Sequence, residues 1–239
     1  MSLIPPNPTT SEEDFQVCTP EHCFYAFDTL FTTLTKKKAI QPKFADEKFP
    51  LFVTWNVRCP GKQPRLRGCI GNFEAQPLHE GLSEYALISA FQDHRFRKIE
   101  SRELDSLECS ISLLTDFEDA SSYLDWTVGV HGIQITFPHP SFLASDRSEA
   151  PSPLSSSSSI PTRSNLKHSF SSTYLPQVAE EQGWNKIEAI DSAIQKAGWN
   201  GRITEDIRRS IRLRRYQSKA YTVGWDEYVE WREANGGSM

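Results

Sequence analysis

The stretch Arg65-Leu66-Arg67-Gly68-Cys69-Ile70-Gly71 concentrates two arginines, two glycines and one cysteine in seven consecutive residues. Glycine allows backbone angles and close backbone contacts that other side chains prevent. We therefore expect Gly68 and Gly71 either to have positive φ or to pack closely against another backbone. A plainer alternative fits the same residues: a strand that bends at glycine, with Cys69 as a small core side chain.

The residues before the 65–71 stretch predict a β-hairpin. Bulky side chains alternate with others over residues 51–57, which indicates a strand. Residues 59–64, Cys-Pro-Gly-Lys-Gln-Pro, are typical of a turn. The strand is therefore expected to pair with the 65–71 stretch. The same alternation predicts strands over residues 109–114, 133–137, 211–216 and 221–223.

Helices are predicted from capping residues and apolar spacing. Thr19 suits an N-cap and Pro20 the first helical position, and apolar residues recur at helical spacing over residues 24–34. Similar signals predict helices after Pro77 and Asn185, with short helices over residues 176–182 and 226–232. Strands and helices mix without regular β-α-β alternation, which favours the α+β class.

The composition is that of an ordinary globular chain. With 239 residues, of which 38% are hydrophobic and 24% charged, it can form one large domain or two small ones. The net charge of −5 argues against broad, nonspecific nucleic-acid binding. We find neither a membrane-spanning apolar run nor a secretory signal. The five cysteines are interpreted as reduced thiols in the cytoplasm or nucleus.

One segment stands apart from the rest. Residues 141–172 hold 13 serines and three prolines with almost no periodicity. Such a composition cannot bury enough apolar surface to offset the entropy lost on ordering. We therefore expect a disordered loop within a single domain that spans residues 19–232. Residues 1–18 are expected to be a flexible N-terminus, and residues 233–239 a frayed tail.

Residues 67–71, Arg-Gly-Cys-Ile-Gly, resemble the signature of the AMMECR1 domain family, and further motifs follow in the family's order. These are residues 84–87 (Glu-Tyr-Ala-Leu), 90–96 (Ala-Phe-Gln-Asp-His-Arg-Phe), 109–114 (Cys-Ser-Ile-Ser-Leu-Leu), 125–126 (Asp-Trp), 129–133 (Gly-Val-His-Gly-Ile), 174–179 (Tyr-Leu-Pro-Gln-Val-Ala), 182–184 (Gln-Gly-Trp) and 190–191 (Ile-Asp). The resemblance covers residues 19–230. It implies an α+β fold with a mixed, largely antiparallel sheet, flanking helices, a smaller second lobe and a cleft near the 65–71 stretch. The serine-rich segment then reads as an insertion, and no cofactor is implied.

Cys69 is the leading candidate for chemistry. A nucleophilic thiol needs a lowered pKa, supplied by nearby cations or backbone N–H groups, and Arg65 and Arg67 lie close in sequence. His131, in a second glycine-rich turn, is the best candidate base, and the resemblance carries a His-Gly pair to this position. These residues form the hypothetical catalytic pair Cys69 and His131.

A ligand-binding role is predicted for the neighbouring polar residues. Arg65 and Arg67 can bind an anion through parallel hydrogen bonds, and Gly68 and Gly71 can admit it close to the backbone. Asp93 and Arg95 form another polar cluster at the exit of a predicted helix. The resemblance implies that these segments come together with His131.

No metal site is predicted. Cys18 and Cys23 flank His22, but no second cysteine pair follows at zinc spacing. Cys59 and Cys69 are too far apart for a zinc knuckle. The chain also contains neither a phosphate-binding glycine loop nor a nucleophile elbow.

Basic residues concentrate near the C-terminus: Arg202, Arg208, Arg209, Arg212, Arg214, Arg215 and Lys219. Arg212 and Arg214 share a strand face, which could contact nucleic acid. A solvated surface is the favoured alternative, because aromatic residues do not interleave beyond Tyr216.

Two classes of function remain, and the sequence does not decide whether the protein is an enzyme. The first is an enzyme with Cys69 as nucleophile, His131 as base and a small anionic substrate. The second is a noncatalytic binding or regulatory module that contacts a peptide, a nucleotide or nucleic acid. The thiol between glycines favours the first class, and the lack of a complete catalytic triad favours the second.

Overall fold

The computed structural model describes residues 17–59, 61–143 and 169–239. They form two compact units. The first comprises the residues up to Leu113 and those from Lys219 onward, and the second runs from Leu114 to Ser218. Almost all of the predicted flexible N-terminus, residues 1–18, and most of the predicted loop, residues 141–172, lie outside the described residues.

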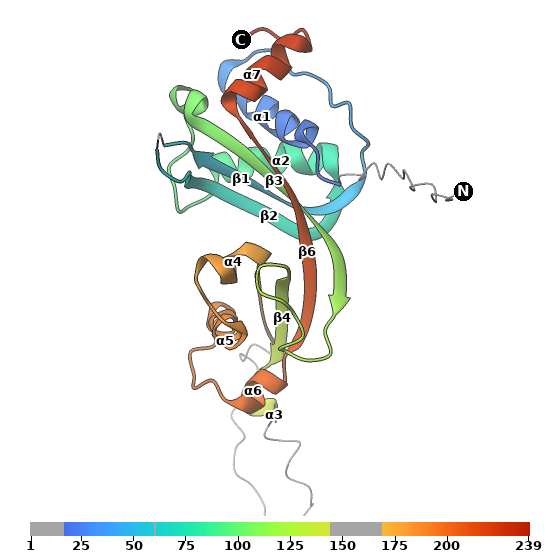
Figure 1. The fold of residues 1–239 in the computed structure, drawn as a ribbon, viewed down its shortest axis with the longest axis vertical. Coiled ribbons are helices and arrows are strands. Elements are labelled where there is room, and N and C mark those ends of the chain that lie inside the picture. Colours follow the sequence, from blue (N-terminus) through green and yellow to red (C-terminus); the bar gives the residue numbers. More distant parts are fainter. Residues whose placement is uncertain (1–16, 60, 144–168) are drawn as a thin grey trace, which may run out of the picture. The chain divides into compact units, whose positions relative to one another are not determined.

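The described elements combine helices with one six-stranded sheet of order β2-β1-β3-β6-β4-β5. In chain order (Figure 1) they are α1 (Pro20–Thr35), β1 (Lys48–Val57), β2 (Arg65–Pro77), α2 (Leu78–Phe91), the 3-10 helix η1 (Ser101–Ser106), β3 (Leu107–Asp119), β4 (Gly132–Pro138), α3 (Pro140–Leu143), β5 (Ser169–Tyr174), α4 (Pro176–Glu181), α5 (Lys186–Lys196), α6 (Glu205–Arg209), β6 (Arg212–Gly224) and α7 (Trp225–Ala234). β1 pairs antiparallel with β2 and β3, and β4 with β5 and β6.

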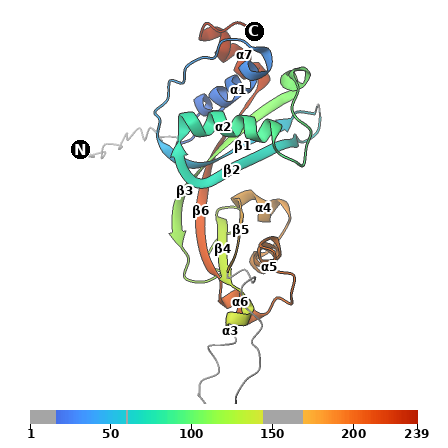
Figure 2. The ribbon, with the colours of Figure 1, turned by 180° about the vertical axis from the view of Figure 1, so that it is seen from behind.

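In the first unit, one face of the sheet is covered by helices. Along β1, Leu51, Val53 and Trp55 are fully buried, while the residues between them are half-buried. The buried face packs with residues of α1, α2 and α7 in one apolar core, and Figure 2 shows α2 lying along β1 and β2. The Trp55 indole N–H donates to the Ala86 carbonyl of α2 at 3.0 Å. The predicted alternation therefore decides which side of the hairpin meets the helices.

A buried ion pair joins α1 to α7. Asp28 accepts hydrogen bonds from Arg232 and, at 2.9 Å, from Tyr228. Both charged side chains are almost completely buried, so each compensates the other's loss of hydration. Arg232 also donates to the Ser238 carbonyl at 3.1 Å. The tail predicted over residues 233–239 thus begins inside α7 and is bonded to it.

The second unit has a separate core. The inward residues of β4, Ile133, Ile135 and Phe137, are buried with apolar residues of α4, α5, α6 and β6. Figure 2 shows α5 beside β4 and β5. Asn185 caps α5 as predicted, since its side chain accepts hydrogen bonds from the N–H groups of Ile187 and Glu188.

Two predicted boundaries are wrong. β6 is one continuous strand, where two shorter strands were expected, and it lies between β3 and β4 in the sheet. The predicted disordered segment is too wide at both ends, since Pro140–Leu143 forms α3 and Ser169–Tyr174 forms β5. β5 is rich in serine, but its backbone groups pair with β4, which composition alone does not reveal.

The α+β class and the largely antiparallel sheet are confirmed. None of the helices in the described residues combines the length and apolar content that crossing a bilayer requires. The cleft expected near the 65–71 stretch stays a prediction.

Candidate functional site

The two glycines of the 65–71 stretch are places of close backbone approach. Neither has a left-handed φ. A Cβ atom on Gly68 would lie 2.2 Å from the Ser89 carbonyl oxygen of α2, and one on Gly71 would lie 2.2 Å from the Leu51 carbonyl oxygen of β1. The expectation of close packing against another backbone is confirmed. The absence of a side chain at Gly68 lets α2 lie directly on β2.

Cys69 lies opposite Thr54 in the β1–β2 pairing. The Thr54 hydroxyl donates a hydrogen bond to the Cys69 Sγ atom at 3.1 Å. Burial raises the pKa of the Cys69 thiol, and the Thr54 hydrogen bond and the Arg95 charge oppose this rise only in part. This direction is opposite to that expected for an activated nucleophile, because the thiol loses more hydration than its polar neighbours replace.

Asp93 and Arg95 hold the main chain of Cys69. Asp93, buried at the exit of α2, accepts a hydrogen bond from the Cys69 N–H at 3.0 Å. Arg95 donates to the Cys69 carbonyl at 3.1 Å and to both Asp93 oxygens, at 2.9 and 2.7 Å. These hydrogen bonds from Arg95, helped by the backbone N–H groups of Cys69 and Arg95, lower the pKa of Asp93 to about 2.

Asp93 and Arg95 bond main-chain groups of β2 that would pair with a neighbouring strand if β2 were inside the sheet. β2 is at the edge of the sheet, so the outward N–H and C=O groups of Cys69 have no strand to pair with. The Asp93 carboxylate and the Arg95 guanidinium supply the acceptor and the donor instead. We call Asp93, Arg95 and the Cys69 main chain the edge clamp. The structure thus brings together three of the predicted site residues.

Arg67 is also bonded internally. Its guanidinium donates to both oxygens of Glu103, at 2.9 and 3.2 Å, and to the main-chain carbonyls of Arg97 and Lys98. Although burial opposes the change, the hydrogen bond from Arg67 lowers the pKa of Glu103. Arg65, in contrast, is exposed at the start of β2. Of the two predicted anion-binding arginines, only Arg65 keeps its side chain in solvent.

His131 lies in the second unit, just before β4. Its Nδ1 atom accepts a hydrogen bond from the Thr127 N–H at 3.0 Å. The following Gly132 lies against Tyr216, because a Cβ atom there would be 2.4 Å from the ring. The pairing of His131 with Cys69 stays a prediction, because the two residues belong to different units.

The cysteines near the N-terminus are core residues. Cys18 donates to the Ile111 carbonyl at 3.5 Å, and Cys23 to the Tyr221 carbonyl at 3.1 Å. Burial raises the pKa of both thiols, that of Cys18 to about 12. His22 Nδ1 accepts a hydrogen bond from the Thr19 N–H at 3.0 Å and so completes the start of α1. Among the described residues, no group of three or more His, Cys, Asp or Glu side chains could hold a metal ion.

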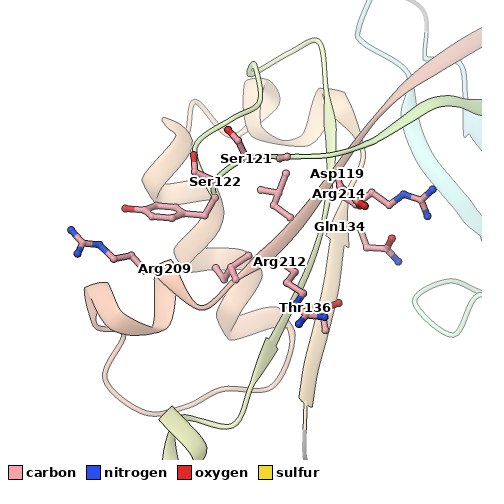
Figure 3. Close-up of a pocket in the computed structure, with 12 residues that line it drawn as sticks. Asp119, Ser121, Ser122, Gln134, Thr136, Arg209, Arg212 and Arg214 are labelled. Atoms are coloured by element: carbon pink, nitrogen blue, oxygen red, sulfur yellow. The ribbon is translucent and has the colours of Figure 1, made fainter. Parts of the chain in front are cut away.

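The basic residues near the C-terminus divide into two groups. Arg208 pairs with Asp191 at 2.7 Å, and Arg215 with Glu118 and Asp125, each at 2.7 Å. Arg212 and Arg214 are exposed and line a pocket of the second unit (Figure 3). Their alternation with buried Ile211 and Leu213 was visible in the sequence, but the rest of the pocket was not.

Comparison with known proteins decides the family. A family model of AMMECR1 matches residues 23–221. The chain belongs to the AMMECR1 family. It is 45% identical over 217 residues to an uncharacterised Arabidopsis thaliana protein, covering 91% of this chain and 90% of the relative. It is 36% identical over 221 residues to an uncharacterised Schizosaccharomyces pombe protein, covering 90% and 98% respectively.

A solved structure supports the fold. The crystal structure of an uncharacterised protein, PH0010 from Pyrococcus horikoshii, matches with a TM-score of 0.61 and 24% identity. The match covers 87% of this chain and 94% of the archaeal one. At this identity the likeness concerns the fold. The family membership and the fold predicted from the 65–71 stretch and its companion motifs are therefore confirmed.

Proposed function

We propose that the protein is a noncatalytic binding or regulatory module, in which the 65–71 stretch is a structural element. One observation carries this proposal: the charged groups around Cys69 are occupied by each other. Asp93 and Arg95 bind the Cys69 main chain, and Arg67 binds Glu103. A substrate anion would have to displace these internal partners.

The state of the thiol supports the same reading. A thiol whose pKa lies above its ordinary value is mostly protonated near neutral pH, and the thiolate is the attacking species. Thr54 donates to the sulfur rather than removing its proton. Cys69 therefore resembles a packed polar residue of the sheet more than a nucleophile.

The second candidate is an enzyme that uses Cys69 and His131 on a small anionic substrate. One observation favours it: the Cys69 side chain is only half-buried, and the Arg95 charge lowers the pKa of its thiol. This candidate needs His131 to approach the sulfur and needs Arg95 to be free to stabilise the thiolate.

Partners and location follow from the same proposal. A binding module of net charge −5 suits a small ligand or a protein partner better than long nucleic acid, which repels negative surfaces. Free cysteines in the described residues suit a reducing compartment. We accordingly propose a location in the cytoplasm, the nucleus or both.

Alkylation of the full-length protein with iodoacetamide, followed by mass spectrometry at several pH values, tests the proposal. Cys59 is half-buried outside the edge clamp and serves as the internal reference. We expect Cys69 to react no faster than Cys59 at pH 7, with a rate that still rises above pH 9. The variant Cys69→Ser should change stability by about 1 kcal/mol or less.

The opposite result would favour the enzyme. A Cys69 rate well above that of Cys59, reaching a plateau below pH 8, would indicate an ionised thiol. A reduction of that rate in His131→Ala, with the melting curve unchanged, would show that the imidazole acts on the sulfur.

A further inference from the structure

The second unit contains a pocket of about 800 Å3 that lies apart from the edge clamp and the 65–71 stretch in the sequence. One side is formed by β6 and β4, and the other by residues 119–123, which are the last residue of β3 and the segment after it (Figure 3). The Ala120 N–H donates to the Leu213 carbonyl at 2.9 Å and so fixes this segment to β6. Because all lining residues lie between Leu114 and Ser218, the pocket belongs to the second unit alone.

The strand register places two arginines and two neutral polar residues side by side. Arg214 lies opposite Gln134, and Arg212 opposite Thr136. All four line the pocket, and Figure 3 shows them on the same side of the strands. The intervening Ile135 and Leu213 are buried in the core of the second unit. The same alternation that builds this core therefore presents two guanidinium groups from one short run of strand.

These two arginines differ from their basic neighbours in their partners. In the part of the chain that the structure describes, no carboxylate lies within ion-pair distance of Arg212 or Arg214. Arg214 instead has its guanidinium carbon 4.9 Å from the centre of the Phe117 ring, a contact that orients the side chain without neutralising it. Arg209, which also lines the pocket, pairs with Glu205 at 3.2 Å.

We propose that this pocket binds the phosphate group of a small organic phosphate, through Arg212 and Arg214. This inference names a ligand class for the binding module and rests on that proposed function. A phosphate dianion matches two guanidinium groups in charge, whereas one carboxylate matches only one, and arginine binds phosphate oxygens through paired hydrogen bonds. The Gln134 amide and the Thr136 hydroxyl can complete the set of donors.

The pocket favours a small ligand over nucleic acid. Its volume is that of ordinary small-molecule sites. Asp119 also lines it, and this carboxylate lowers the net positive charge of the lining, which disfavours a chain of phosphates, while it can accept a hydrogen bond from a ligand hydroxyl or amino group. The remaining wall contains Ser121, Ser122 and Tyr123. Their hydroxyls are bonded to Asp125, to the Leu124 N–H and to Glu205 respectively, so this wall chiefly limits the size of the ligand.

Calorimetric titration of the full-length protein tests the inference with three probes: inorganic phosphate, glucose 6-phosphate and adenosine 5′-monophosphate. Glucose and adenosine are the phosphate-free controls. We expect at least one organic phosphate to bind more tightly than inorganic phosphate, and the phosphate-free controls not to bind. The double variant Arg212→Gln, Arg214→Gln should weaken binding by about tenfold or more.

The control is Arg202→Gln, which removes one positive charge, half of that lost in the double variant, from an exposed residue of the same unit outside the pocket lining. It should leave affinity within about twofold of the parent protein. The double variant Arg212→Lys, Arg214→Lys keeps the charge, so a folded lysine protein with reduced affinity would assign the effect to the guanidinium geometry.

Several outcomes would overturn the inference. These are no binding of any probe at low millimolar concentration, binding of inorganic phosphate alone, or equal weakening by Arg202→Gln. Tighter binding of a single-stranded oligonucleotide than of either organic phosphate would assign the surface to nucleic acid. None of these outcomes depends on Cys69 alkylation, so a failure here and a failure of the noncatalytic proposal can be told apart.

Discussion

Two arginines of the first unit and two of the second have opposite surroundings. In the first unit, Arg67 and Arg95 each bond to a carboxylate and to a main-chain carbonyl. In the second, Arg212 and Arg214 are exposed on a sheet face with no carboxylate partner among the described residues. At a strand edge, an arginine can satisfy backbone groups and become part of the fold. On a strand face it leaves its donors available to a ligand.

The largest effect on stability is expected from Gly68→Ala, which would disturb the packing of α2 on β2 and with it the bonded arginines of the first unit. The new Cβ atom would meet the Ser89 carbonyl oxygen at 2.2 Å. Because that oxygen belongs to the backbone of α2, the helix must move, and Asp93 at its exit moves with it. We expect a loss of about 3 kcal/mol in the free energy of unfolding, measured by urea denaturation.

The control for this substitution is Ala75→Val, at an exposed position of the same strand. It should change stability by less than about 0.5 kcal/mol. Equal stability of Gly68→Ala and the parent protein would mean that α2 does not lie on β2 as described, and the edge clamp would lose its basis.

A smaller effect is expected from Asp93→Asn, which mimics the protonated carboxyl group. The pKa of Asp93 is lowered from its usual 3.8 to about 2, so the unfolded chain binds a proton in this range while the folded chain does not. The stabilisation is therefore complete above about pH 4 and is lost as the pH falls towards 2. At pH 7 the variant should be less stable by about 2 kcal/mol.

The stability difference between the parent protein and Asp93→Asn should shrink progressively between pH 4 and pH 2, as followed by urea denaturation at each pH. Glu84→Gln removes the same charge from an exposed site on α2 and should change stability by less than about 0.5 kcal/mol at any pH. A difference for Asp93→Asn that does not depend on pH would mean that its carboxylate is not held in ionised form by the clamp.

The smallest effect is expected from the double variant Arg212→Gln, Arg214→Gln in the absence of ligand. Both side chains are exposed and make no ion pair in the described residues, so their loss should alter stability by less than about 0.5 kcal/mol. Thermal unfolding with and without added salt measures this. If the free energy of unfolding falls by more than about 1 kcal/mol, Arg212 and Arg214 are structural residues like Arg67 and Arg95. The contrast between the two pairs of arginines would then not hold.

Local signals in the sequence predicted much of the fold. The Thr19–Pro20 start of α1, the Asn185 cap of α5 and the β1–β2 hairpin all form as expected. Each depends on residues that are neighbours in sequence, where capping and alternation act directly. β5 was missed because its serine-rich strand is stabilised by β4, more than thirty residues away.

The candidate site was predicted in part. The sequence identified Cys69, Asp93 and Arg95, and the structure brings them together in the edge clamp. Glu103, the partner of Arg67, carried no signal of its own, since a carboxylate in a short helical turn is common. Asp119, Gln134 and Thr136 also gave no signal, because three separate segments meet to form their pocket.

Motifs in the sequence identified the family, and the periodicity of apolar residues predicted the α+β class and the side of each strand that faces the core, because periodicity is a local property of the chain. Which charges are neutralised and which remain available depends on the tertiary structure. Desolvation of Cys69, the approach of Asp93 to its backbone and the exposure of Arg212 and Arg214 depend on distances between segments far apart in sequence. Electrostatic and hydration energies follow those distances rather than the order of residues.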